Sequence, residues 1–318
     1  MEGPEKYDLT KEEFDKALML AEMTILMRSG DFKTKNINPK SIFIISQAGG
    51  GKTGLKRFVN SQTQGNFIEI NPDEVAIYHK YYKQILEEYP KESHMQLQKF
   101  VGPALDNFLR QRAEQLRKDL IQEGTFGNTK GYLDILEFQK NGGNAPIGKV
   151  QEDGQRETIK VNGGYDIEID ILAVDRFESL LSSYEREQYF IESGLPPRAV
   201  TPENHDRAYL NLLKTVEEIE NRGLFDKMKV FKRGYDESRP ELVHIAGDGK
   251  YPSVVECIKE TRFDERKKIL GNAEKYKDRI NILKGKVKTE IQMDKLRKLE
   301  EEFELCLQQE NSEDLEQD

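Results

Sequence analysis

The stretch SIFIISQAGGGKTGLKRFVN, residues 41–60, joins a short apolar segment to a glycine-rich turn. Residues 41–45 form a short apolar run that includes β-branched residues, as is typical of a strand buried on both faces of a parallel sheet. The turn ends in Gly51, Lys52 and Thr53, and the residues that follow are typical of a helix. A strand, a glycine-rich turn and a helix in this order predict a phosphate-binding loop.

The chemistry of such a loop depends on its backbone. Glycines let successive N–H groups turn toward phosphates, while the lysine reaches the β- and γ-phosphates and the Ser/Thr hydroxyl binds Mg²⁺. The usual motif begins with glycine, whereas this chain has Ser46 there. A glycine-rich turn with an incidental Lys-Thr pair is the alternative, but the flanking strand and helix favour the phosphate site. The expected binding residues are Ala48, Gly49, Gly50, Gly51, Lys52, Thr53 and Gly54.

Polar residues also follow two further predicted strands. Asp73 comes after the strand at 66–71; Glu123 ends the strand at 119–123, and Thr125 follows it. The carboxyl ends of adjacent parallel strands face one crevice, so these side chains are expected to meet the phosphate loop. Asp73 has two interpretations that spacing alone does not separate. It either accepts a proton from an attacking hydroxyl or serves as the N-cap of the next helix.

Two arginines are candidate cations for phosphoryl transfer. Arg186 lies within a predicted helix, and Arg198 follows two prolines. A transferring γ-phosphoryl group needs positive charge around it. A solvated surface position is the alternative for each arginine.

Strands that alternate with helices predict an α/β fold, a P-loop NTPase-like parallel sheet flanked by helices. Further strands are expected at 164–175 and 228–232, and a long helical stretch at 75–118 with breaks near 89–90 and 102–103. We assign residues 1–255 to the P-loop domain, with a polar inserted loop or hairpin at 144–163. Residues 256–318 form a charged helical tail with a heptad-like stripe, suited to packing on another helix.

Composition limits the partners. The net charge of −9 over 318 residues gives no overall basic field for nucleic acid. Cys257 and Cys306 are too few for a disulfide framework. No window has the roughly 18 consecutive apolar residues of a membrane helix, and the first residues lack the apolar core of a signal peptide. The expected location is therefore cytoplasmic, without membrane or nucleic-acid partners.

The order of these motifs resembles the zeta toxin family of bacterial toxin–antitoxin systems. The resemblance covers residues 42–234 and leaves the insertion and the tail aside. It rests on five segments in sequence: AGGGKTGL, TQGNFIEINPDE, LIQEGT, YEREQYFIESGLPPRAVTPENHDRAY and GLFDKMKVFKRG.

The resemblance implies a kinase that uses ATP and Mg²⁺ to phosphorylate the amino sugar of UDP-N-acetylglucosamine, which blocks peptidoglycan precursor synthesis. It also implies a helical antitoxin partner that obstructs the ATP site. It assigns roles to particular residues: Lys52 and Thr53 to the phosphates and metal, Asp73 to proton abstraction, Glu123, Thr125 and Asp106 to the substrate, Arg186 and Arg198 to the γ-phosphate, and a structural role to His205 and Asp206.

The chain departs from the family pattern at two positions. Gly127 stands where many relatives have an arginine, and Ser46 replaces the first loop glycine. Two alternatives therefore stay open: a kinase with another acceptor, or a nucleotide-binding or interaction module without turnover. The tail also has several interpretations, namely a built-in restraint, a docking site for a partner helix, a dimerisation arm, or helices that complete the core.

Overall fold

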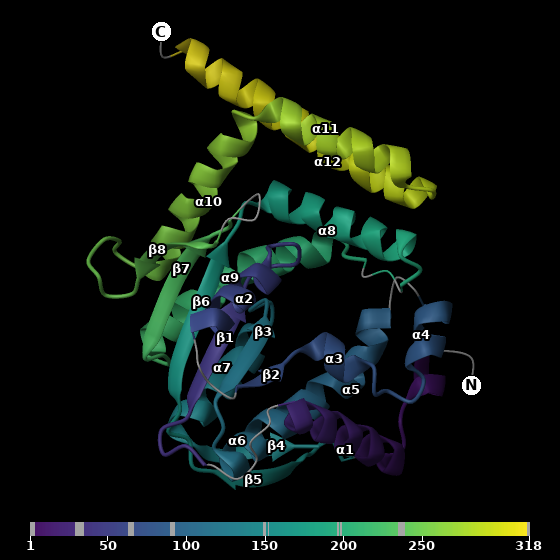
Figure 1. Ribbon diagram of the computed structural model, residues 1–318, viewed down its shortest axis with the longest axis vertical. Coiled ribbons are helices and arrows are strands. Elements are labelled where there is room, and N and C mark those ends of the chain that lie inside the picture. Colours follow the sequence, from purple (N-terminus) through teal and green to yellow (C-terminus); the bar gives the residue numbers. More distant parts are fainter. Residues whose placement is uncertain are drawn as a thin grey trace.

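The computed structural model describes residues 4–28, 35–62, 67–89, 93–148, 151, 153–195, 197, 199–234 and 239–316. A six-stranded sheet forms its centre (Figure 1). Its strands are β1 (Lys40–Ile45), β2 (Ile68–Ile70), β3 (Leu120–Gly124), β6 (Asp166–Ala173), β7 (Lys227–Lys232) and β8 (Glu241–Ile245).

The strand order across the sheet is β2-β3-β1-β6-β7-β8. All neighbours pair in parallel except β8, which runs antiparallel to β7. The predicted α/β fold with a mainly parallel sheet is therefore confirmed. β8 was not expected, because its short half-exposed segment ELVHI lacks the apolar character of the central strands.

The apolar run in β1 is explained by burial on both faces of the sheet. Ile42 and Ile44 contact the cluster that includes Leu55 and Val59 of α2 (Lys52–Gln62). Phe43 belongs to the larger cluster on the opposite face. Alternate residues of one strand thus fill two cores, which is why the segment shows no polar alternation.

The larger cluster is covered by helices from both halves of the chain (Figure 1). Thr10 and Glu13 form a capping box at the start of α1: the Thr10 N–H donates to Glu13 Oε2 at 3.0 Å, and the Glu13 N–H to Thr10 Oγ1 at 3.3 Å. The helices of this layer are α1 (Lys11–Arg28), α3 (Pro72–Ala76), α4 (Tyr82–Glu88), α5 (Ser93–Asn107), α7 (Thr129–Asn141), α9 (Pro202–Arg222) and α10 (Val254–Leu270).

The region before β3 differs from the sequence prediction. A break was expected at 102–103, yet α5 continues through Pro103. Phe100, Val101 and Ala104 are buried around the proline, so tertiary packing holds the helix together there. The regular helix instead changes at Phe108–Arg112, a π-helical segment that leads into α6 (Ala113–Leu116).

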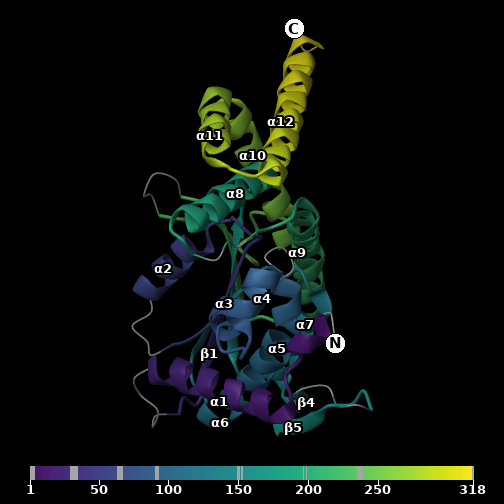
Figure 2. The ribbon, with the colours of Figure 1, turned by 90° about the vertical axis from the view of Figure 1, so that its right-hand side faces the viewer.

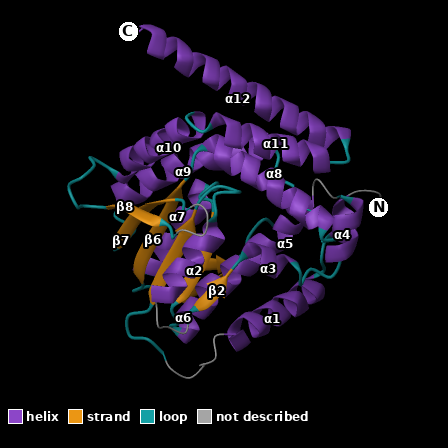
Figure 3. Cartoon of the chain, turned by 45° about the horizontal axis from the view of Figure 1, so that its top comes forward, coloured by secondary structure: helices purple, strands orange, loops and turns teal. Residues whose placement is uncertain are grey.

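The insertion and the tail both form regular structure. Within the predicted insertion at 144–163, the strands β4 (Gly143–Ile147) and β5 (Glu157–Val161) pair antiparallel. After α10 the tail continues as α11 (Ala273–Lys286) and α12 (Glu290–Glu316), which lie against α8 (Arg176–Glu192) (Figures 2 and 3). The predicted stripe is confirmed as a packing surface, since its apolar residues join those of α8 in one cluster. Within the described ranges, no helix combines the length and apolar character of a membrane span.

Candidate active site

The loop between β1 and α2 is bent at two glycines. Gly49 has a φ angle of 72° and Gly51 one of 92°, in the left-handed region that favours glycine. The Lys52 ammonium donates hydrogen bonds to the backbone oxygens of Ser46 at 2.7 Å and Gln47 at 3.1 Å. The lysine therefore binds carbonyl groups of its own loop, and its charge lies beside the predicted phosphate cradle.

The Ser46 side chain fits inside the loop, in the space beside Gly50. Its side chain is fully buried, and Oγ donates to the Leu172 backbone oxygen at 2.9 Å. A Cβ atom at Gly50 would lie only 2.0 Å from this Oγ. The hydroxyl thus occupies space that the glycine at position 50 leaves open, and the departure from the usual motif does not prevent the loop from folding.

The start of α2 is accessible. Ala48 lies half-buried in the loop, whereas Thr53 and Gly54 are exposed in the first helical turn. Apart from the backbone of its own helix and its chain neighbours, no atom of the described chain lies within 4 Å of a Cβ placed at Gly54. The loop, its glycines and this open helix N-terminus fit a nucleotide phosphate with a metal ion at the Thr53 hydroxyl.

Lys52 shares its electrostatic environment with three of the predicted residues. Burial lowers the pKa of the Lys52 ammonium to about 8; Glu123 and Asp73 act to raise it, and Arg186 lowers it. These groups come from α2, β3, α3 and α8 respectively. The structure therefore brings together four candidate residues that are up to 134 positions apart in the chain, from Lys52 to Arg186.

The helix after β2 clarifies the position of Asp73. Asn71 is the N-cap of α3, and its side-chain oxygen accepts a hydrogen bond from the Asp73 N–H at 3.0 Å. The capping role considered for Asp73 thus belongs to Asn71. Asp73 is exposed in the first turn of α3, where its carboxylate acts on Lys52.

Glu123 lies near the end of β3, and Thr125 follows that strand. The Glu123 carboxylate forms an ion pair with Lys56 of α2, with Oε1 and Nζ 2.8 Å apart. Lys56 was not among the residues predicted from the sequence. The Thr125 hydroxyl accepts from the Gly127 N–H at 3.3 Å. A Cβ atom at Gly127 would lie 3.6 Å from Ala208 of α9, so a larger side chain at this position would lie against that helix.

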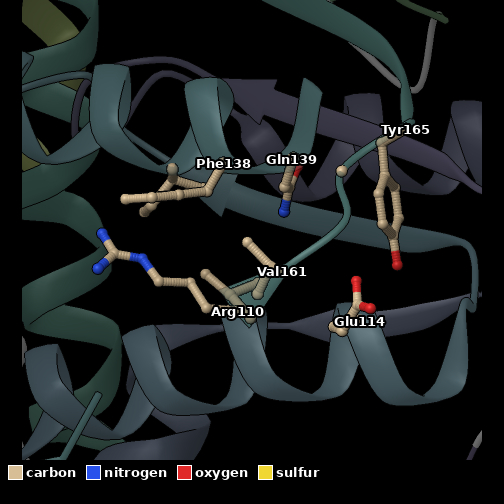
Figure 4. A pocket seen from close by; sticks show the side chains of 9 residues that line it. Arg110, Glu114, Phe138, Gln139, Val161 and Tyr165 are labelled. Atoms are coloured by element: carbon tan, nitrogen blue, oxygen red, sulfur yellow. The ribbon is translucent and has the colours of Figure 1, made fainter. Parts of the chain in front are cut away.

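Asp106 is brought to a different part of the molecule. Its carboxylate pairs with Arg156 of the insertion at 3.2 Å. Nearby, Arg110 donates to the Pro146 backbone oxygen at 3.1 Å and lies over the Phe138 ring, beside a small cavity (Figure 4). The end of α5 lies next to β4, and the Asp106–Arg156 ion pair anchors the insertion there. We therefore leave Asp106 out of the proposed site.

Of the two predicted arginines, the structure describes Arg186 and leaves Arg198 out. Arg186 lies on α8 and acts on Lys52 as described. Arg198 lies outside the described residues, so its role stays a prediction.

The predicted structural pair His205 and Asp206 lies behind the phosphate loop. Ser179 Oγ is 2.9 Å from His205 Nε2, and His205 Nδ1 is 3.2 Å from Asp206 Oδ1. Gln47 of the loop donates to the same Ser179 hydroxyl at 3.1 Å. Ser179 and His205 are fully buried, so this chain of hydrogen bonds supports the loop and is closed to a substrate.

Arg233 is, like Lys56, a residue of this region that the sequence prediction did not include. It follows β7, and its Nη1 donates to the Gly49 backbone oxygen at 3.2 Å. The only signal was its place in the FKRG segment, where an arginine after a strand is equally typical of a surface position.

The sequence is similar to those of known bacterial toxins. The family model described as zeta toxin matches residues 25–145 and 150–239. Toxin PezT of Streptococcus pneumoniae is 25% identical over 227 residues, which cover 71% of this chain and 79% of that protein. Toxin zeta of Enterococcus hirae is 25% identical over 197 residues, 62% of this chain and 61% of that protein, so the match spans about three fifths of that relative.

A solved structure also shares the fold. It belongs to the PezAT chromosomal toxin–antitoxin system of Streptococcus pneumoniae and superimposes with a TM-score of 0.64. The match covers 87% of this chain and 98% of the other at 22% sequence identity.

Proposed function

Because the chain belongs to the zeta toxin family, we propose that it is an ATP-dependent kinase that acts as a toxin. Its proposed acceptor is a hydroxyl of the amino sugar of UDP-N-acetylglucosamine, and its product would block peptidoglycan precursor synthesis. The observation that carries the proposal is the group of Lys52, Asp73, Glu123 and Arg186 at the carboxyl edge of one parallel sheet.

Each residue has a defined part in the proposed transfer. Lys52 exchanges its backbone carbonyl partners for the β- and γ-phosphates of ATP. Asp73 takes the proton of the acceptor hydroxyl as the oxygen bonds to the γ-phosphorus and the bond to the ADP oxygen breaks. Arg186, with Arg198 as a second cation, offsets the charge of the transferring group.

Other residues hold the ligands. Thr53 is the proposed protein ligand of Mg²⁺, which when bound supplies positive charge next to the phosphates. Glu123 and Thr125 line the proposed acceptor site beside Asp73. The ion pair with Lys56 restrains the Glu123 carboxylate before substrate binds.

The family relation also suggests a partner and a place of action. The related pneumococcal protein is part of a toxin–antitoxin system, and we propose that a helical antitoxin restrains this chain in the cytoplasm, where ATP and nucleotide sugars are available. Expression in a bacterium should arrest growth, and the Asp73→Asn variant should not. Equal toxicity of both forms would argue against the kinase as the cause.

The decisive experiment measures transfer from ATP to a panel of UDP-sugars by mass spectrometry. Asp73→Asn is expected to lower kcat by about 10²–10⁴-fold with the Kd for ATP unchanged, since it removes only the proton acceptor. Lys52→Ala should weaken ATP binding as well. Asp15→Asn, a change of the same chemistry in an exposed pair on α1, is the control.

Two results would count against the proposal. If Asp73→Asn keeps the wild-type kcat, Asp73 is not the base. If wild type binds ATP and transfers phosphate to no acceptor, the protein is a binding module; transfer to a sugar nucleotide other than UDP-N-acetylglucosamine would retain the kinase and correct the acceptor.

A further inference from the structure

Glu178 is a buried carboxylate between the tail and the phosphate loop. It lies in the first turn of α8 with 1% of its surface exposed. From the tail, Arg279 Nη1 donates to Glu178 Oε2 at 2.6 Å. From the sheet, Arg233 Nη1 donates to Glu178 Oε1 at 3.1 Å. A carboxylate so buried needs compensating charge, and two arginines from distant segments provide it.

Arg233 extends this contact to the loop. The nitrogen that binds Glu178 also lies 3.2 Å from the Gly49 backbone oxygen. Gly49 is tightly enclosed as well, because a Cβ atom there would lie 1.8 Å from the Ser179 backbone oxygen of α8. The peptide plane after Gly49 is therefore fixed from two sides, and α8 and Arg233 determine its orientation.

A second arginine of the tail approaches the loop from α10. Arg262 is buried and stacks on the Tyr209 ring, with Cζ 3.7 Å from the ring centre. Its Nη2 lies 3.5 Å from Gln47 Oε1. The Gln47 amide in turn donates to the Val174 backbone oxygen at 2.9 Å. The tail thus reaches the loop on two separate routes.

We propose that the C-terminal helices α10 and α11 position the phosphate-binding loop, with Arg279 acting through Glu178 and Arg233 on Gly49. In this arrangement the tail supports the nucleotide site from behind, against α8, and is needed for full nucleotide affinity. Arg279 and Arg262 are positioning residues. The inference rests on the proposed nucleotide site, and it assigns to the tail a function that its heptad-like stripe did not indicate.

The charges of Glu178, Glu185 and Arg233 explain why the loss of Arg279 should change the conformation of the phosphate loop. Arg279 also binds Glu185 at 2.8 Å, so its removal leaves two carboxylates with less compensation. Arg233 is then drawn toward Glu178 and away from the Gly49 oxygen. The loop loses a restraint on the peptide that must face the phosphates, and nucleotide binding weakens.

The test compares ATP and ADP binding by calorimetry in Arg279→Met and a matched control. Arg279→Met should raise the Kd for ATP by about three- to thirtyfold. Arg297→Met removes an exposed arginine that forms ion pairs with Glu290 and Asp294 of its own helix, and should change the Kd less than about twofold. Folded fraction is checked by circular dichroism at the temperature of the titration.

A double-mutant cycle keeps the test independent of stability. If Arg279 acts through Glu178, Glu178→Gln and the double variant Arg279→Met/Glu178→Gln should have similar Kd values, and KM for ATP should rise more than kcat falls. A lower melting temperature with an unchanged Kd would overturn the proposal, as would additive effects. If wild type binds no nucleotide, the proposed nucleotide site itself fails, which is a different result.

Discussion

At Lys52, burial and neighbouring charges act on one ammonium group in opposite directions. Burial prevails and lowers the pKa to about 8, while the negative charges of Asp73 and Glu123 limit the decrease. The phosphates of a nucleotide would act as those carboxylates do, more strongly. Binding should therefore raise the pKa of the lysine, and by linkage it should become weaker wherever the free lysine has lost its proton.

The affinity for ATP is accordingly expected to depend on pH. Below pH 8 the lysine is charged and the Kd should be nearly constant; above it the Kd should rise by up to about tenfold per pH unit. Calorimetry between pH 7 and 9.5 measures this, and proton uptake at pH 8 appears as a dependence on the buffer's ionisation enthalpy.

The matched variant is Lys52→Arg, whose guanidinium stays protonated throughout this range. It should bind ATP more weakly than wild type at pH 7 because its geometry differs, with a Kd that does not change up to pH 9.5. A constant wild-type Kd over the same range would contradict the assignment of the titration to Lys52.

Ser46 and Gly50 form a second test at the residue scale, since the serine hydroxyl lies where a Cβ at position 50 would be. Gly50→Ala alone should destabilise the fold by about 1–3 kcal/mol through overpacking. In a Ser46→Gly background the same change should cost less, by an interaction energy of about 1 kcal/mol. Denaturant unfolding of the four proteins gives this value, and strictly additive effects would show that the two positions are independent.

At the scale of elements, the sequence was most informative where local rules and burial agree. The strand at β1 and the glycine-rich turn each depend on adjacent residues, and both are present. Pro103 is the opposite case: local preference predicts a break, and burial of its neighbours keeps α5 intact. β8 was not predicted either, because its half-exposed segment lacks the apolar character of the central strands and its pairing with β7 is interrupted by a register shift.

In the candidate site, too, local sequence patterns predicted some residues, while tertiary contacts determine others. A motif identified Lys52, and position after a strand identified Asp73 and Glu123. Arg233 and Glu178 could not be predicted from the sequence. Each forms its contacts with residues of other elements, and neither lies in a recognisable motif. The ion pair of Asp106 with Arg156 could not be predicted for the same reason, since only the fold brings the end of α5 beside the insertion.

For the molecule as a whole, α8 joins two regions that sequence analysis treated as separate. Its first turn contacts the phosphate loop, and its apolar residues pack with α11 and α12. The Phe177 and Phe303 rings stack with their centres 4.4 Å apart and their planes 16° from parallel. These rings belong to a cluster of α8, α11 and α12 that is separate from the clusters on the sheet, and α8 links this cluster to the phosphate loop through the Gln47–Ser179 hydrogen bond. This arrangement agrees with the interpretation of the tail as helices that complete the fold.

Phe303→Ala should therefore destabilise the P-loop region together with the tail. The substitution removes a ring with 2% of its surface exposed and should cost about 3–5 kcal/mol, which corresponds to a lower melting temperature by about 5–10 °C. Calorimetry should show one transition, and loss of ATP binding on heating should coincide with it. Leu305→Ala, an exposed apolar residue on the same helix, should change the melting temperature by less than about 2 °C. Two separate transitions in the Phe303→Ala protein, with nucleotide binding retained after the first, would show instead that the tail unfolds independently and that α8 does not transmit its stability to the site.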